Sequence, residues 1–311
     1  MSRRITMCHE GERAWRCSAP ILLHGLGDSH RTWRRTAPRL ARNFRVILPD
    51  LPGHGLSGRP DAPYTLEWYA QVVTGFIDAL DLDRTHVVGH SFGGGVAQWL
   101  LLRAPSRIDR MVLVAPGGLS REVSLGLRLA SFPIIAPVLA PHLMGVGTRV
   151  MLRTGSELLR AEDDEIDRSA WLNAAPGSAR AFCRTVSGCI DMFGQTVQAW
   201  DHLHDVPQLP PMKVVWGARD RIVPFRHAVG AAASRIEGAA FVQYDRSGHF
   251  PHLEESARFG EEVALFLDPS IAQPRPRVRP LPVLVRRPGP WRRLVVAMRR
   301  AVRARLRALA A

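Results

Sequence analysis

A serine flanked by two glycines stands at a position suited to a catalytic nucleophile. The sequence Gly89-His90-Ser91-Phe92-Gly93 follows a short apolar run and precedes a helical pattern. In a tight turn between a strand and a helix, side chains at the two glycine positions would collide with the neighbouring backbone. The same turn exposes the serine hydroxyl near a helix N-terminus, whose amides stabilise developing negative charge. Ser91 is therefore predicted to be a nucleophile.

A serine hydroxyl needs a base to remove its proton, and the base needs an acid to orient it. Asp220 follows the apolar run Met212–Trp216, and His249 follows the run Ala239–Tyr244. A serine, an acid and a histidine that occur in this order, each after a later strand, are typical of a catalytic triad. We therefore predict Asp220 as the acid and His249 as the base. The competing candidates, at less suitable positions, are Asp205, Asp245 and His252.

Acyl transfer through Ser91 would create an oxyanion that two backbone amides must stabilise. The N–H of Phe92, next to the nucleophile, is predicted to be one donor. The sequence HGLGD at residues 24–28 ends the first apolar run and offers the N–H of Leu26 as the second donor. Gly25 in this segment permits a close approach of the backbone.

Short apolar runs alternate with helical patterns through most of the chain. The runs carry few charges and end in turn-forming residues, as expected for strands that are buried on both faces. The patterns at Leu66–Leu80 and Gly94–Arg103 between them are helical. This alternation predicts a mostly parallel sheet with helices on both faces. The predicted strands are residues 20–24, 44–50, 85–89, 110–115, 212–216 and 239–244.

The alternation stops between residues 118 and 206, where no run is typical of a strand. Because this segment begins after one predicted strand and ends before the next, we expect a helical insertion above the sheet. The core then comprises residues 1–117 and 207–268. The helices predicted in the insertion are Arg121–Leu129, Pro133–Leu143, Glu162–Trp171 and Ser178–Leu203.

The formal net charge of +14 is concentrated at one end of the chain. Residues 269–311 contain 12 arginines and no acidic residue, so residues 1–268 carry a net charge of only +2 and need no nucleic-acid partner. Residues 269–290 are rich in proline and arginine and are predicted to be a linker or a disordered tail. Residues 291–311 have apolar residues at helical spacing among arginines. This pattern predicts a basic amphipathic helix on an anionic membrane surface, with disorder in solution as the alternative.

The composition excludes several classes of protein. The 46% hydrophobic and 23% charged residues are usual for a globular domain. The first residues lack the apolar core of a signal peptide, and no uninterrupted apolar stretch is long enough to span a membrane. We expect a cytoplasmic protein with no metal or cofactor, in which the tail is the candidate for peripheral membrane attachment. The four cysteines are too few and too scattered for a disulfide scaffold or a zinc ribbon, and we expect free, partly buried thiols. They are Cys8, Cys17, Cys183 and Cys189.

Together these motifs resemble those of the α/β-hydrolase superfamily over residues 20–268. The resemblance rests on HGLG at 24–27, DLPGHGLS at 50–57, GHSFG at 89–93, GARD at 217–220 and GH at 248–249. It implies an α/β-hydrolase fold in which residues 118–206 form a helical cap. Within the superfamily, the sequence looks most like capped bacterial esterases related to the hydrolases of ring-fission products. The chain before Ile21 is short for the family's first two strands, so Arg3–Cys17 is expected to form a stunted edge hairpin.

The resemblance implies a serine hydrolase that cleaves a carboxylic ester or a related carbonyl compound through an acyl-enzyme. Hydrolysis of C–C bonds is the first alternative, although ring-fission hydrolases usually carry Asn and Trp where this sequence has His90 and Phe250. An acyltransferase and a cofactor-free haloperoxidase would use the same triad. A protein that only binds a membrane or a partner through the basic tail is the non-enzymatic alternative. Substrate contacts are expected from His24, Gly25, His90, Arg184 and Phe250.

Overall fold

The computed structural model describes residues 19–132, 135–154, 163–199, 208–225 and 238–272, together with positions 202 and 206. The edge hairpin predicted at Arg3–Cys17 and the tail helix predicted at 291–311 lie outside these residues. So does the predicted linker, except for its first four residues, which form the 3-10 helix η5 (Pro269–Ala272).

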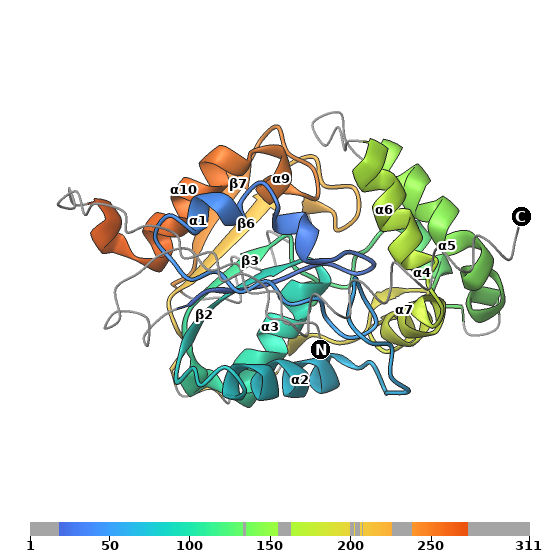
Figure 1. Cartoon of the computed structure of the whole chain (residues 1–311), viewed down its shortest axis with the longest axis horizontal. Coiled ribbons are helices and arrows are strands. Elements are labelled where there is room, and N and C mark those ends of the chain that lie inside the picture. Colours follow the sequence, from blue (N-terminus) through green and yellow to red (C-terminus); the bar gives the residue numbers. More distant parts are fainter. Residues whose placement is uncertain are drawn as a thin grey trace, which may run out of the picture. The chain divides into compact units, whose positions relative to one another are not determined.

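Among the described residues, five strands form a central parallel sheet (Figure 1). They are β1 (Ile21–Leu23), β2 (Thr85–His90), β3 (Ile108–Val114), β6 (Met212–Gly217) and β7 (Ala240–Tyr244), in the spatial order β1-β2-β3-β6-β7. Every neighbouring pair is parallel, which confirms the predicted fold class. The carboxyl ends of parallel strands lie at one edge of a sheet, so the loops that follow β1, β2, β6 and β7 meet there.

The strand predicted at residues 44–50 is wrong in its extent. Only Ile47 pairs with the sheet, through an isolated bridge to Ile21. The N–H of Ile47 donates to the carbonyl of Pro20 at 2.9 Å, and Pro49 has no N–H with which to extend a ladder. The apolar pattern of this segment has another cause, because Phe44 and Leu48 are buried in the core.

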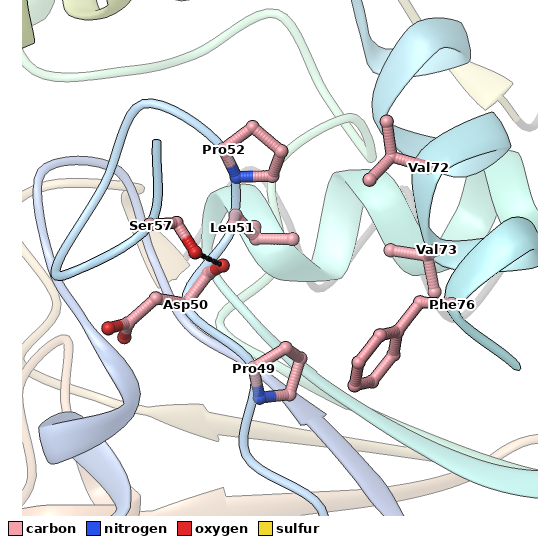
Figure 2. Close-up of a pocket in the computed structure, with 8 residues that line it drawn as sticks. All are labelled: Pro49, Asp50, Leu51, Pro52, Ser57, Val72, Val73 and Phe76. Carbon is pink, nitrogen blue, oxygen red and sulfur yellow. Dashed lines mark hydrogen bonds between the residues drawn. The ribbon is translucent and has the colours of Figure 1, made fainter. Parts of the chain in front are cut away.

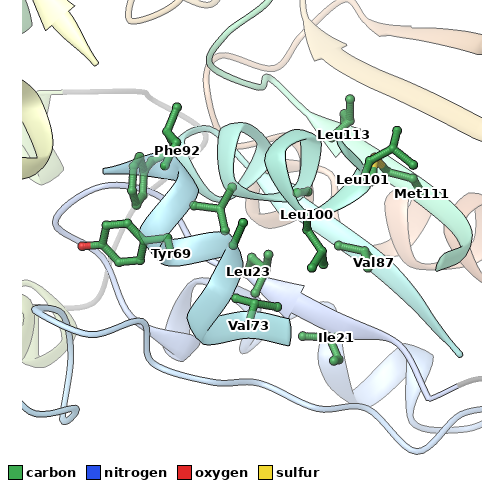
Figure 3. Close-up of a cluster of buried hydrophobic side chains, with 14 of the residues drawn as sticks. Ile21, Leu23, Tyr69, Val73, Val87, Phe92, Leu100, Leu101, Met111 and Leu113 are labelled. Carbon is green, nitrogen blue, oxygen red and sulfur yellow. The ribbon is translucent and has the colours of Figure 1, made fainter. Parts of the chain in front are cut away.

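Alternate side chains of the strands pack on opposite faces of the sheet. On one face, Ile21 and Leu23 belong to a cluster that includes residues of α2 (Leu66–Asp78) and α3 (Phe92–Arg103) (Figure 3). On the other face, Leu22 packs in a cluster with residues of α1 (Ala37–Leu40) and α10 (Ser256–Leu267). Figure 1 shows these two layers of helices on either side of the sheet. Because both faces are covered, the strands are continuous apolar runs.

Helix α2 illustrates how the sequence pattern becomes an element of the fold. The hydroxyl of Thr65 accepts a hydrogen bond from the N–H of Trp68 at 3.2 Å and caps the helix N-terminus. Buried residues then recur at spacings of three and four and form the stripe that covers the sheet. They are Leu66, Tyr69, Ala70, Val73 and Ile77. The short helices elsewhere in the core are η1 (His30–Trp33), η2 (Pro105–Arg107) and α9 (Pro251–Glu254).

In the described part of the chain between β3 and β6, four α-helices are followed by a short β-hairpin. We call residues 118–206 the helical segment; its helices are α4 (Leu125–Leu129), α5 (Ile135–Thr154), α6 (Asp163–Asn173) and α7 (Ser178–Ser187). The helix predicted at Ser178–Leu203 is wrong beyond Ser187, because the antiparallel hairpin of β4 (Ile190–Asp191) and β5 (Gly194–Gln195) follows. Gly194 has a φ of +128°, and a Cβ there would overlap the carbonyl of Arg121. No described helix is both long and apolar enough to cross a membrane.

Candidate active site

Ser91 lies on a sharp turn between β2 and α3, with a φ of 51° and a ψ of −116°. Few residues other than glycine adopt a positive φ, and holding one there costs about 1–3 kcal/mol. A Cβ on Gly89 would lie 2.5 Å from the carbonyl oxygen of Gly93, and a Cβ on Gly93 would lie 2.5 Å from the carbonyl oxygen of Leu23. The two flanking glycines are therefore what allows the turn to pack against the sheet.

The backbone of Ser91 is held by hydrogen bonds from both sides. Its carbonyl accepts from the N–H groups of Gly94 at 2.9 Å, Gly95 at 3.2 Å and Gly117 at 2.9 Å. The first two donors belong to α3, whereas Gly117 precedes the helical segment. Ser91 as a whole is half-buried.

The structure brings Ser91, Asp220 and His249 into one hydrogen-bonded series. His249 Nε2 lies 2.9 Å from Ser91 Oγ, and His249 Nδ1 lies 2.7 Å from Asp220 Oδ2. Both His249 and Asp220 are buried. A carboxylate at Nδ1 keeps the proton on that nitrogen, so Nε2 is free to accept the serine proton.

Both carboxylate oxygens of Asp220 are fixed by N–H donors. Oδ1 accepts from the backbone N–H groups of Ile222 at 2.8 Å and Val223 at 3.0 Å. Oδ2 accepts from the indole Nε1 of Trp216 at 3.2 Å, in addition to His249. Three of these donors belong to the same strand and loop as Asp220, so the local chain orients the carboxylate toward His249.

The loop that carries the acid and the loop that carries the base are in direct backbone contact. The N–H of Arg219 donates to the carbonyl of Ser247 at 3.0 Å. A Cβ on Gly217 would lie 2.7 Å from the carbonyl carbon of Ser247 and closer still to the carbonyl oxygen of Gly248. On the other side, the N–H of Gly248 donates to Glu254 Oε2 at 2.6 Å. Glycine at position 217 therefore permits the approach that joins Asp220 to His249.

His90, expected from the sequence to contact substrate, supports the base loop instead. Its side chain is buried, and its Nε2–H donates to the carbonyl of His249 at 2.9 Å. Burial, followed by the proximity of His252 and His249, holds the pKa of His90 well below its ordinary value. The neutral ring of His90 thus binds the backbone of the loop that carries His249, and the expectation that His90 contacts the substrate is wrong.

The structure separates the competing acid and base candidates from the triad. The Nε2 of His252 lies 2.8 Å from Thr32 Oγ1 in the core, and burial lowers the pKa of this histidine. The carboxylate of Asp245 is exposed and accepts a hydrogen bond from Gln243 Nε2 at 2.6 Å. Asp205 lies outside the described residues.

The loop of residues 24–28 follows β1, and we call it the oxyanion loop after its predicted role. The ring of His24, its first residue, binds backbone groups: the N–H of Leu51 donates to His24 Nε2 at 2.9 Å, and His24 Nδ1 lies 2.8 Å from the carbonyl of Gly25. Both ring nitrogens bind backbone and the ring is fully buried, which corrects the expected substrate contact of His24. The N–H of Asp28 closes the turn by donating to the carbonyl of Gly25 at 3.3 Å.

The oxyanion loop runs close to the nucleophile. A Cβ on Gly25 would lie 3.4 Å from Ser91 Cβ and 3.1 Å from His90 Nδ1, so a side chain at position 25 would crowd the turn. Within the described residues, neither the N–H of Leu26 nor that of Phe92 donates to a backbone carbonyl. Phe92 begins α3, and N–H groups of a first helical turn have no partner in their own helix. Both amides are therefore free to serve as the predicted donors.

A second buried carboxylate organises the neighbouring loop at residues 50–57. Asp50 Oδ1 accepts from the N–H of His30 at 2.6 Å, and Asp50 Oδ2 accepts from the N–H of Leu56 at 2.8 Å. Burial by itself would raise the pKa of Asp50, but the hydrogen bonds from the His30 ring and backbone and the nearby His24 hold it below its ordinary value. Figure 2 shows a small pocket between this loop and α2; none of its eight lining residues belongs to the triad.

The remaining predicted contacts lie in different surroundings. Arg184 pairs with Asp61 on the surface and donates to the carbonyl of Ala62 at 3.0 Å, so this arginine has a partner without any substrate. Phe250 is half-buried and packs with its ring centroid 5.2 Å from that of His249. The described residues contain no group of three side chains that could hold a metal ion.

Sequence reasoning missed three residues that support the site. Trp216, four residues before Asp220, could have been suspected because it belongs to the same strand–loop unit. Asn173, at the end of α6, donates to the carbonyl of Gly27 at 2.6 Å, and Glu165 binds Arg31. These two gave no local signal, because their partners are 146 and 134 residues away.

The comparisons with known proteins agree with this fold. A family model described as alpha/beta hydrolase fold matches residues 21–256. An uncharacterized protein of Mycobacterium tuberculosis is 34% identical over 272 residues, which cover 84% of this chain and 79% of the relative. The 2-hydroxymuconate semialdehyde hydrolase of a Pseudomonas species is 30% identical over 262 residues, which cover 79% of this chain and 86% of the relative. The solved structure of a meta-cleavage product hydrolase from Pseudomonas fluorescens matches with a TM-score of 0.64 and 26% identity, over 81% of this chain and 91% of that one. The chain therefore belongs to the α/β-hydrolase family.

Proposed function

We propose that this protein is a serine hydrolase that cleaves carboxylic esters or related carbonyl compounds. The observation that carries the proposal is the contact of Ser91 Oγ with His249 Nε2 at 2.9 Å and of His249 Nδ1 with Asp220 Oδ2 at 2.7 Å. A nucleophile in contact with its base, and a base in contact with its orienting acid, is the arrangement that acyl transfer requires.

In the proposed first step, His249 Nε2 takes the proton of Ser91 as Oγ attacks the carbonyl carbon of the ester. Asp220 holds the imidazole in the required tautomer and stabilises the imidazolium that forms. The N–H groups of Leu26 and Phe92 stabilise the oxyanion, and loss of one such donor typically costs about 10²- to 10³-fold in rate. His249 then gives its proton to the departing alkoxide, which leaves an acyl group on Ser91.

In the second step, a water molecule replaces the alcohol. His249 takes a proton from this water, whose oxygen attacks the acyl carbon, and the same two amides stabilise the second oxyanion. Collapse of this intermediate returns the proton from His249 to Ser91 Oγ and releases the carboxylic acid. The substrate's acyl chain would lie beneath the helical segment, which we propose to be the cap.

A panel of p-nitrophenyl esters of increasing acyl length tests the proposal. The protein should hydrolyse at least one of them, and Ser91→Ala should lose nearly all turnover and all labelling by a fluorophosphonate. Ser187→Ala is the matched control, because Ser187 is an exposed serine whose hydroxyl donates to the carbonyl of Arg184, at 3.2 Å. A wild-type protein without Ser91-dependent turnover across the panel would contradict the proposal.

Hydrolysis of a C–C bond in a ring-fission product is the second candidate. The 30% identity to a 2-hydroxymuconate semialdehyde hydrolase favours it. His90 and Phe250 argue against it, since ring-fission hydrolases usually carry Asn and Trp at these positions. The test is the decay of the visible absorbance of 2-hydroxymuconate semialdehyde. A kcat/KM on this compound that exceeds the kcat/KM on every ester would establish the second candidate instead.

A further inference from the structure

We propose that Asn173, the last residue of α6, is a positioning residue that holds the oxyanion loop in its working conformation. This inference rests on the proposed function, because it assigns a role in stabilising the oxyanion. It concerns a residue of the helical segment, 82 positions beyond the nucleophile in the sequence.

Both hydrogens of the Asn173 amide are used. Its Nδ2 donates to the carbonyl of Gly27 at 2.6 Å and to Thr148 Oγ1 at 3.0 Å. Thr148 Oγ1 in turn donates to the carbonyl of Met144 at 2.7 Å, so it must accept from Asn173. These partners fix the orientation of the amide, with nitrogen toward the oxyanion loop.

The oxyanion loop has little support of its own at this point. Gly27 has a φ of +67°. Among the described residues, the hydrogen bond from Asp28 N–H to the carbonyl of Gly25, at 3.3 Å, is the one backbone–backbone hydrogen bond within the turn. A glycine has access to many backbone conformations, and a hydrogen bond to its carbonyl selects one of them. Because Leu26 directly precedes Gly27, a change of backbone conformation at Gly27 would also displace the Leu26 amide.

The chain on either side of Asn173 is tied to the core by Arg59. Arg59 Nη2 donates to the carbonyl of Leu172 at 3.2 Å, and Arg59 Nε donates to Ser178 Oγ at 2.7 Å. The same guanidinium is anchored to the core through the carbonyl of Ser57 at 2.9 Å. Asn173 is buried at the end of α6, so its side chain has few other positions available.

A second contact from α6 supports the same assignment. Arg31, in η1 three residues after the oxyanion loop, places Nε 2.7 Å and Nη2 2.5 Å from Glu165 Oε2. Glu165 lies about two turns before Asn173 on α6, and its side chain is only 9% exposed. Helix α6 therefore binds the core at two points, at Gly27 within the oxyanion loop and at Arg31 just beyond it.

The contacts connect the part of the protein that would receive the acyl group with the amide that would stabilise the oxyanion. A hydrogen bond that holds this amide in place should matter most when the oxyanion forms. Its loss should therefore lower kcat with little change in KM, because the ground-state carbonyl makes weaker use of the amide.

Two variants test the proposal with p-nitrophenyl ester turnover and inhibition by a trifluoromethyl ketone. The ketone forms a tetrahedral adduct with Ser91 and so reports the strength of the oxyanion site. Asn173→Leu keeps the approximate shape without a donor, and Asn173→Ala removes the group. We expect kcat to fall about 10- to 100-fold in both, below the loss of an entire donor, and ketone affinity to fall by a similar factor. Each rate is divided by the concentration of active sites titrated with a fluorophosphonate, so that unfolded protein does not lower the measured kcat.

Arg149→Ala is the matched control. Arg149 Nε binds Asp167 Oδ1 at 3.0 Å on the exposed side of α5 and α6, so the variant weakens the same pair of helices without touching the oxyanion loop. Its kcat and ketone affinity should equal those of the wild type.

The outcomes separate this proposal from the proposed function. Unchanged kcat and ketone affinity in both Asn173 variants would overturn the positioning role, as would a rise in KM at constant kcat. Wild-type protein without Ser91-dependent turnover or ketone binding would overturn both proposals.

Discussion

The contact between the acid loop and the base loop allows a sharp test of the proposed triad. In Gly217→Ala, the new Cβ would stand 2.7 Å from the carbonyl carbon of Ser247 and closer still to the carbonyl oxygen of Gly248. Non-bonded carbon atoms prefer about 3.5–4.0 Å, so the two loops must separate by about 1 Å. The contacting atoms are backbone and cannot rotate away.

Such a separation acts directly on the hydrogen bonds of His249. A displacement of about 1 Å would stretch the 2.7 Å contact to Asp220, or the 2.9 Å contact to Ser91, beyond hydrogen-bond length. Misplacement of a catalytic group by about 1 Å can cost about 100-fold in rate. We expect kcat/KM on a p-nitrophenyl ester to fall by about this factor, while circular dichroism shows a folded protein.

Gly75→Ala is the matched control, since a Cβ at this position in α2 would meet nothing within 4 Å. Alanine in place of a helical glycine should leave turnover unchanged and stabilise the protein by up to about 1 kcal/mol. The reasoning fails if Gly217→Ala keeps turnover within about threefold of the wild type while folding normally, because loop separation would then be irrelevant to the triad.

Three further predictions follow from the structure. Asp220→Asn should lower kcat about 10⁴-fold without a change in geometry, because an amide at this position favours the wrong tautomer of His249. Steady-state ester hydrolysis measures the effect, and a fall in kcat of less than about tenfold would exclude Asp220 as the acid. Acid should destabilise the fold: burial lowers the pKa of His54 to about 3 and that of His86 to about 4 from the ordinary 6.5. Since the unfolded chain binds these protons below pH 6.5 and the folded one does not, each histidine should cost roughly 2 kcal/mol at pH 5, and equal urea midpoints at pH 7.5 and 5 would contradict this. Removal of residues 273–311 should abolish co-sedimentation with anionic liposomes and preserve ester turnover; equal sedimentation of both forms would exclude the proposed membrane contact.

The residues that sequence could place are those with a strong local pattern. Ser91, Asp220 and His249 each follow a buried apolar run at the carboxyl edge of the sheet, and the parallel topology brings these strand ends together. The alternation of apolar runs and helical patterns likewise predicted a mostly parallel sheet with helices on both faces. Their positions follow from the nearest neighbours in the chain, so one sequence was enough.

What sequence could not place depends on distant partners. The hydrophobic pattern at residues 44–50 reports burial, which a strand and a buried irregular segment share, so the extent of pairing was overestimated. The hairpin after Ser187 is stabilised where Gln195 donates to the carbonyls of Ser120 and Glu122, and no helical pattern could reveal these bonds. His90 similarly offered a polar side chain beside the nucleophile, and only the fold showed that it faces backbone.

The hydrogen bond from Gly117 to the carbonyl of Ser91 marks where two proteins of this family could be joined. Gly117 belongs to the support of the nucleophile, whereas the N–H of Gly118 donates to Gln195 Oε1 within the helical segment, at 2.7 Å. The peptide bond between Gly117 and Gly118 thus separates a residue that supports the turn at Ser91 from one that binds the helical segment. A chimera that takes residues 118–206 from a relative would keep the turn at Ser91, yet it should reach full turnover only if the incoming segment also supplied an amide for Gly27. Compatibility between the two parts would then depend in part on a side chain far from either junction.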